Sequence, residues 1–156
     1  MKYKAITNPL KGKTDMRKNF INLCLSIIFL MFTGISNTHA QELRSSSGSS
    51  TGKIDSDGTI RNGSGSSVGK IDSDGTIRNS SGSSIGKIDS DGTIRNGSGS
   101  SIGKVDSDGT VRNGSGSSIG KVDSDGTVRN SSGSSIGSAN GVSKEKAAVV
   151  FFFFEF

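Results

Sequence analysis

Isolated aliphatic residues between polar neighbours recur along most of the chain at a spacing of 17 residues. In the first copy, Lys53-Ile54-Asp55 and Thr59-Ile60-Arg61 each place one isoleucine between two polar residues. Such alternation is typical of a short β-strand with one apolar and one polar face. The repeated unit is S-S-[TVI]-G-K-[IV]-D-S-D-G-T-[IV]-R-N-[GS]-S-G, and its second serine falls at Ser50, Ser67, Ser84, Ser101 and Ser118. Five near-identical copies predict one small structural unit that stacks on its neighbours.

The segment between the two isoleucines, residues 55–59, allows two hairpin turns. A two-residue Asp-Gly loop would place Ile60 opposite Asp55 and mix the two faces. A type I turn followed by a left-handed Gly58 places Ile54 opposite Ile60. Because a slip of one residue moves every side chain to the other face, the aliphatic pair favours the second register. Glycine suits this position since a positive φ costs it nothing.

A third position in the unit also favours bulky residues, although it stands out of phase with the other two. It holds Thr51, Val68, Ile85, Ile102 and Ile119 in successive copies. Positions 51 and 54 have opposite strand parity, so the side chain at 51 points away from Ile54 unless Gly52 forms a bulge. We expect this residue to pack against the neighbouring repeat.

A single repeat is too small to fold alone. Burial of three aliphatic side chains contributes roughly 5–9 kcal/mol, whereas ordering one unit costs about 25 kcal/mol. The core must therefore be shared between copies. The chain also begins and ends its array with half repeats, at residues 42–48 and 135–137. We expect these halves to pair and close a ring; the alternative is an open solenoid with frayed ends.

The C-terminal segment, residues 143–156, departs from the repeat and ends in Phe-Phe-Phe-Phe-Glu-Phe156. It is apolar on all sides, so it must be surrounded whether it is strand or helix. We expect it to plug or cover the centre of the ring. A membrane contact and a self-association patch are the alternatives.

Residues 1–40 have the features of a secretory signal peptide. Six basic residues precede an apolar run over 21–35, and Thr38-His39-Ala40 forms a small-x-small cleavage signal. Met16 opens a second possible start. The apolar run is shorter than the ~20 residues of a spanning helix, which argues against an uncleaved anchor. We therefore predict export through the inner membrane to the periplasm or the exterior, with no stable membrane span after cleavage.

The charge balance changes once the leader is set aside. Of 19 Lys and Arg, six lie in residues 1–40, and of 14 Asp and Glu only Asp15 does, which leaves 13 of each sign. No basic excess remains for nucleic acid. Residues 41–156 contain no Cys, His, Trp, Tyr, Pro or Met, so nucleophilic triads and the usual zinc sites are not expected. We predict no enzyme, no catalytic or metal-ligating residues and no cofactor.

Taken together, the leader, the units such as Ile-Gly-Lys-Ile-Asp-Ser-Asp-Gly-Thr-Ile-Arg-Asn at 85–96 and the Phe-rich tail resemble the five-fold beta-flower family of small secreted bacterial proteins. The resemblance covers about residues 42–156 and implies hairpins arranged around a five-fold axis. It carries no activity and gives no residue a role. The expected fold is all-β: five tandem hairpins over 41–142, closed into a propeller-like ring with the segment 143–156 as plug or cover.

The expected function is a non-enzymatic structural or binding module with an unknown ligand. Five copies of a polar surface could bind an envelope component or a glycan with avidity. In the first copy this surface consists of Lys53, Asp55, Arg61 and Asn62. The alternative is that these side chains form a solvent-exposed sheet face that binds nothing. Calcium binding by Asp-Ser-Asp-Gly is a further alternative, but the same four residues are accounted for as a bulged turn.

Overall fold

The computed structural model describes residues 41–156, and the predicted leader with Met16 lies outside the described residues. Twelve short strands fill most of this range. They are β1 (Gln41–Ser45), β2 (Ser50–Ile54), β3 (Thr59–Asn62), β4 (Ser67–Ile71), β5 (Thr76–Asn79), β6 (Ser84–Ile88), β7 (Thr93–Asn96), β8 (Ser101–Val105), β9 (Thr110–Asn113), β10 (Ser118–Val122), β11 (Thr127–Asn130) and β12 (Ser135–Ala139). Two short helical segments follow, α2 (Lys144–Ala148) and the π-helix η1 (Val149–Phe153).

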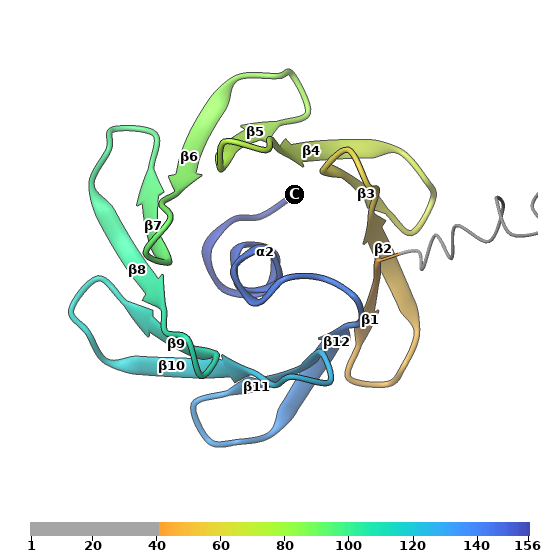
Figure 1. The fold of residues 1–156 in the computed structure, drawn as a ribbon. Coiled ribbons are helices and arrows are strands. Elements are labelled where there is room, and N and C mark those ends of the chain that lie inside the picture. Colours follow the sequence, from red (N-terminus) through yellow and green to blue (C-terminus); the bar gives the residue numbers. More distant parts are fainter. Residues whose placement is uncertain (1–40) are drawn as a thin grey trace, which may run out of the picture. The chain divides into compact units, whose positions relative to one another are not determined.

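The strands form a closed antiparallel barrel, and the half repeats close it (Figure 1). Leu43 of β1 lies opposite Ala139 of β12, and Arg44 lies opposite Ser138. The predicted closure is therefore confirmed, and the open solenoid is excluded. Five hairpins turn through Asp-Ser-Asp-Gly, whereas β1 and β12 complete a sixth pair from the two ends of the array.

The predicted hairpin register is confirmed. Ile54 pairs with Ile60, and Lys53 pairs with Arg61. The amide of Gly58 donates to the carbonyl of Asp55 at 2.9 Å, and Gly58 has a φ of 87°. The left-handed glycine thus allows the tight reversal that brings both isoleucines to the same, buried face.

The third bulky position adopts the orientation that the sequence allowed only with a bulge. Between β3 and β4, Ile60 pairs with Gly69 but Arg61 pairs with Ser67, so Val68 is an extra residue opposite the bond between them. This bulge reverses the parity of the strand. Val68 and its aliphatic equivalents therefore pack against the shared core. Thr51 differs: it is exposed, and its hydroxyl donates to the carbonyl of Leu43 at 3.1 Å.

The aliphatic residues of the hairpins form one core together with Ala147, Ala148 and Val149 of the C-terminal segment. Figure 1 shows α2 and the C-terminus inside the ring of strands. The choice between strand and helix, which the sequence left open, is thus resolved as helix. Among the described residues, none of the helices has the length and apolar character needed to cross a bilayer.

Five phenylalanine rings of this segment approach one glycine each in the middle of alternate strands, from β12 back to β4. A Cβ atom added to any of these glycines would overlap a ring or lie within 2.6 Å of one. The pairs are Phe151 with Gly137, Phe152 with Gly120, Phe153 with Gly103, Phe154 with Gly86 and Phe156 with Gly69. Gly52, the sixth glycine of this series, has only backbone atoms of β3 as its nearest neighbours.

Candidate functional site at the mouth of the ring

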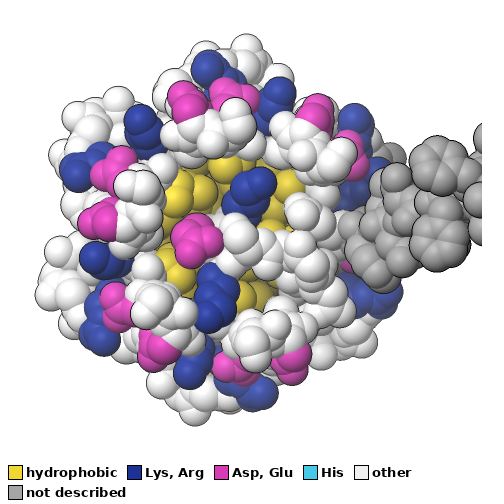
Figure 2. All heavy atoms as spheres, in the orientation of Figure 1, with side chains coloured by type: hydrophobic (Ala, Val, Ile, Leu, Met, Phe, Trp, Pro, Cys, Tyr) yellow, Lys and Arg dark blue, Asp and Glu magenta, His cyan; other side chains and the backbone are white. Residues whose placement is uncertain are grey.

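The five Asp-Ser-Asp-Gly turns lie at one end of the ring, which we call the mouth. They are Asp55–Gly58, Asp72–Gly75, Asp89–Gly92, Asp106–Gly109 and Asp123–Gly126. Figure 2 shows acidic side chains around the opening with basic side chains beside and outside them, and apolar side chains visible inside; further basic and acidic side chains lie over the middle of the opening. The mouth is therefore a repeated polar rim over an apolar interior.

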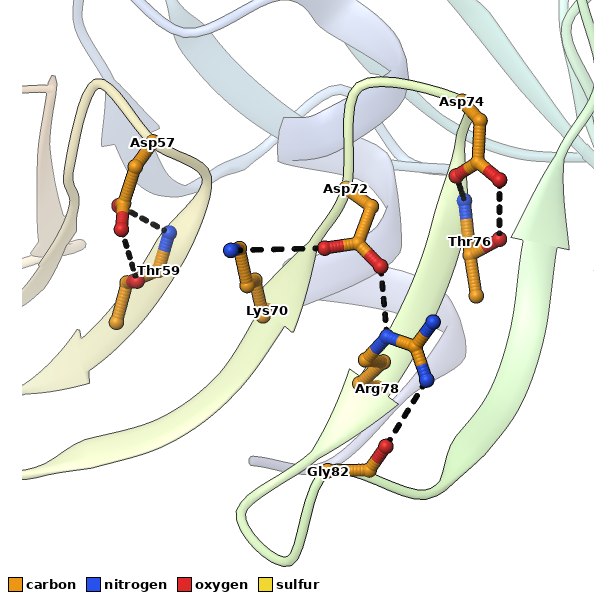
Figure 3. A network of polar contacts seen from close by, with 8 residues as sticks. All are labelled: Asp57, Thr59, Lys70, Asp72, Asp74, Thr76, Arg78 and Gly82. Carbon is orange, nitrogen blue, oxygen red and sulfur yellow. Dashed lines mark hydrogen bonds and ion pairs between the residues drawn. The ribbon is translucent and has the colours of Figure 1, made fainter.

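Each turn is held by its own side chains, as the second one shows (Figure 3). Asp74 accepts hydrogen bonds from the amide and the hydroxyl of Thr76, at 2.9 and 3.0 Å. These bonds, the amide first, hold the pKa of Asp74 below its ordinary value of 3.8. The carbonyl of Gly75 accepts the amide of Ile88 in the next repeat at 2.9 Å. Each turn is thus fixed to the first strand of the next repeat.

The first aspartate of each turn pairs with the arginine across the hairpin. Asp72 accepts from Arg78 Nε at 2.6 Å, and Lys70 Nζ lies 3.6 Å from its other oxygen. Arg78 Nη1 continues to the carbonyl of Gly82 in the outer turn at 3.0 Å. The pairing places the arginine along the outside of the ring and away from the mouth.

The four residues suggested as a binding surface are therefore divided between two places. Lys53, Asp55 and Arg61 form one ion-paired group on the outer face, with N–O distances of 2.8 and 2.5 Å. Asn62 lies at the outer turn instead, where its Oδ1 accepts from the amides of Ser64 and Ser66. The structure does not bring Asn62 into the same polar group as Asp55.

The geometry of the carboxylates bears on the calcium alternative. Both oxygens of Asp57 accept from Thr59, and both oxygens of Asp55 face Lys53 or Arg61. Within residues 41–156, three or more His, Cys, Asp or Glu side chains nowhere converge as they would around a metal ion. These contacts favour the interpretation of Asp-Ser-Asp-Gly as a self-contained turn.

The C-terminal segment breaks the symmetry of the mouth. Helix α2 contacts β8 and β10, and Lys144 Nζ donates to the carbonyl of Ser107 at 2.9 Å. On the other side, Ile88 is only half-buried, while its equivalents Ile71 and Val105 are buried. The helix therefore leans toward one side and leaves space on the other.

Two cavities, of about 380 and 520 Å³, lie between the turns and α2. A third, of about 480 Å³, lies between two turns and Lys87 and is not lined by α2. The first lies between two adjacent turns and α2, over Ile71 and Ile88. Its polar lining includes Ser73, Ser90, Glu145 and Lys146. The sequence did not predict the part played by α2, because its contact with the turns joins residues far apart in the chain.

Comparisons with known proteins agree with this architecture. A family profile described as "5-fold beta-flower protein" matches residues 40–155. Searches among curated proteins and solved structures found no match. Since the profile spans most of the chain, the protein belongs to the 5-fold beta-flower family.

Proposed function

We propose that this protein is an exported, non-enzymatic structural or binding module that presents the mouth of the ring to a partner in the cell envelope. The observation that carries the proposal is the repetition of one turn around a single opening. Each turn is fixed by its own hydrogen bonds and by a bond to the next repeat. Equal, rigid sites on one rim are suited to multivalent binding, since linked weak contacts add avidity.

We further propose that the C-terminal segment plugs the ring and that the ring has five-fold character. Five complete units supply five turns, and five phenylalanine rings lie against five glycines of the strands. The buried Ala147, Ala148 and Val149 supply further bulk to the core. Such a filled interior keeps the rim rigid, and rigidity lowers the entropy lost on binding.

The experiment compares the capture of envelope components by two matched variants of the full protein. Ser73→Arg with Ser90→Arg adds bulk and charge at the exposed tips of two mouth turns. Ser66→Arg with Ser83→Arg makes the same change at exposed positions of two outer turns. A glycan array and an envelope extract are probed with both variants and with the unaltered protein.

We expect the unaltered protein and the outer-turn variant to retain the same glycan or envelope component. The mouth variant is expected to lose it, because the arginines obstruct the opening. Equal retention by both variants, or the absence of any retained component, would leave the protein without a binding role at the mouth.

A further inference from the structure

One mouth turn already holds a lysine side chain, that of Lys144. Its Nζ donates to the carbonyl of Ser107 at 2.9 Å, and the two residues are 37 positions apart. A Cβ atom placed on Gly109 would lie 3.4 Å from Lys144 Cδ, so the lysine methylenes run over the glycine. Asp108 stands beside this contact: its pKa is lowered chiefly by the amide and hydroxyl of Thr110, and Lys144 is among the charges that lower it further.

This turn therefore shows how Asp-Ser-Asp-Gly receives an ammonium group on an aliphatic chain. The serine carbonyl accepts the ammonium, the glycine leaves room for the methylenes, and the second aspartate supplies negative charge nearby. All three groups are repeated in the other four turns, since the same four residues recur.

Only one of those four turns is covered by another residue. At Gly126, Asn140 Oδ1 would lie 2.8 Å from an added Cβ atom. At Gly58, Gly75 and Gly92, the nearest atoms all belong to the first strand of the next repeat. Among the described residues, the carbonyls of the serines in these three turns accept no hydrogen bond. We call Asp55–Gly58, Asp72–Gly75 and Asp89–Gly92 the open turns.

From this repetition we infer that the open turns are docking sites for lysine side chains of a partner protein, which bind as Lys144 binds to the fourth turn. The inference rests on the proposed function, because it names the chemistry that the mouth recognises. The three cavities support it, since the serines of the open turns, Ser56, Ser73 and Ser90, line them. The serine carbonyls of these turns have no other donor among the described residues, although Asp91 of the third open turn already lies 3.6 Å from Lys104 Nζ.

Charge around the first cavity also favours a cation. Its lining contains Asp74 and Glu145 against the single positive charge of Lys146. Asp72 and Asp89 also line it, but each is paired with an arginine at 2.6 Å. The arginines that pair with the first aspartates continue to the outer turns and stay outside this lining. The apolar floor suits the methylenes of a lysine better than it suits a hydrated metal ion.

The test titrates Nα-acetyl-lysine methylamide into the full protein and follows the backbone amide signals of the five turn glycines by NMR. We expect shifts at Gly58, Gly75 and Gly92, and no shift at Gly109 or Gly126. The Nε-acetylated form of the probe lacks the charge and should shift none of them. Affinity for one lysine should be weak, in the millimolar range, because a single exposed charged contact contributes little; a peptide with three lysines should bind at least ~10-fold more tightly.

Two substitutions on the same helix sharpen the test. Lys144→Met vacates the fourth turn, so Gly109 should join the glycines that shift. Lys146→Met removes an equal charge but leaves Lys144 on Ser107, so Gly109 should stay unshifted. A melting curve of each variant shows whether it remains folded, and the pattern in the unaltered protein tests the inference without either variant.

Several results would overturn the inference: no shift with the lysine probe, the same shifts with its acetylated form, or a response at Gly109 as large as at Gly92 before Lys144 is replaced. In each case the mouth could still capture another component, and the arginine variants described above would show it. Failure of the lysine chemistry is thus distinguishable from failure of the proposed function.

Discussion

At the scale of single residues, the glycines in the middle of the strands have neighbouring atoms so close that a side chain does not fit. A Cβ atom on Gly103 would overlap the carbonyl of Arg112 and the ring of Phe153. We expect Gly103→Ala to destabilise the protein by about 1–3 kcal/mol, because the core has no room for the added methyl group. Chemical denaturation followed by circular dichroism measures the change.

Gly63→Ser is the matched control for this substitution. An added Cβ atom at Gly63 would lie 3.6 Å from its nearest neighbours, and two other repeats carry Ser80 and Ser131 at the same place. We expect its effect to stay within about 0.5 kcal/mol. If both substitutions cost the same, the close approach of Phe153 is not what excludes a side chain at Gly103.

The second aspartates of the turns give the protein a defined dependence on acid. Hydrogen bonds from the following threonine, the amide first, lower the pKa of Asp57, Asp74, Asp91, Asp108 and Asp125 below 3.8. A carboxyl with a lowered pKa stabilises the folded state above its unfolded pKa, and this stability is lost as the pH falls through the folded value. We expect the melting temperature to be nearly constant from about pH 7 to pH 5 and to fall below about pH 4.

The effect of salt on this transition distinguishes a pKa lowered by hydrogen bonds from a pKa lowered by ion pairs. Because local hydrogen bonds are the main cause of the lowered pKa, added salt should leave the pH of the transition nearly unchanged. A transition that moved strongly with ionic strength would assign the effect to the surrounding lysines and arginines.

At the scale of elements, the C-terminal segment joins the core of the strands. Val149 is fully buried, so Val149→Ala should cost about 1–3 kcal/mol. Removal of residues 144–156 should abolish cooperative unfolding, since it takes the aromatic rings from the core as well. Scanning calorimetry measures both effects. Glu155→Ala, at an exposed position of the same segment, should change stability by no more than about 0.5 kcal/mol.

The hairpin was the most predictable element, because local rules decide it. The pairing of Ile54 with Ile60 follows from parity and from a glycine that adopts a positive φ. The sequence left the bulge at Val68 open as an alternative, since whether the strand bulges depends on the neighbouring strand and the shared core.

Contacts between distant residues were the least predictable part of the mouth. Nothing in the sequence around Lys144 indicates that it reaches Ser107, 37 residues earlier. The tail was expected at the centre of the ring, but its pairing of rings with glycines depends on the direction of a helix that the sequence did not specify. Charge and composition described the rim correctly as polar, yet they could not show that the first and second aspartates of each turn have different partners.

At the scale of the whole molecule, closure by β1 and β12 removes both free edges of the sheet. A protein that lacks residues 1–47 loses β1 and exposes edges at β2 and β12. Exposed edges pair with other chains, so we expect this variant to form soluble oligomers or aggregates. Size-exclusion chromatography with light scattering compares it with a protein that lacks only residues 1–40.

A substitution within β1 provides the control for this deletion. Glu42→Gln with Arg44→Gln removes a partly buried ion pair of 2.6 Å but keeps the backbone of the strand. This variant should elute like the parent protein, because backbone pairing, not the ion pair, closes the ring. A monomeric deletion variant with an unchanged melting temperature would show that closure contributes little.

The correspondence between five phenylalanine rings and five strand glycines constrains how such a protein can change its length in evolution. Recombination between near-identical copies readily duplicates or deletes whole units of a tandem gene. One glycine of the series, Gly52, already has no ring against it. A chain that gained a unit would have a second such glycine, and a chain that lost one would have a ring without a glycine unless that ring lay against Gly52. We therefore expect the number of repeat units and the number of phenylalanine rings in the C-terminal segment to change together in evolution.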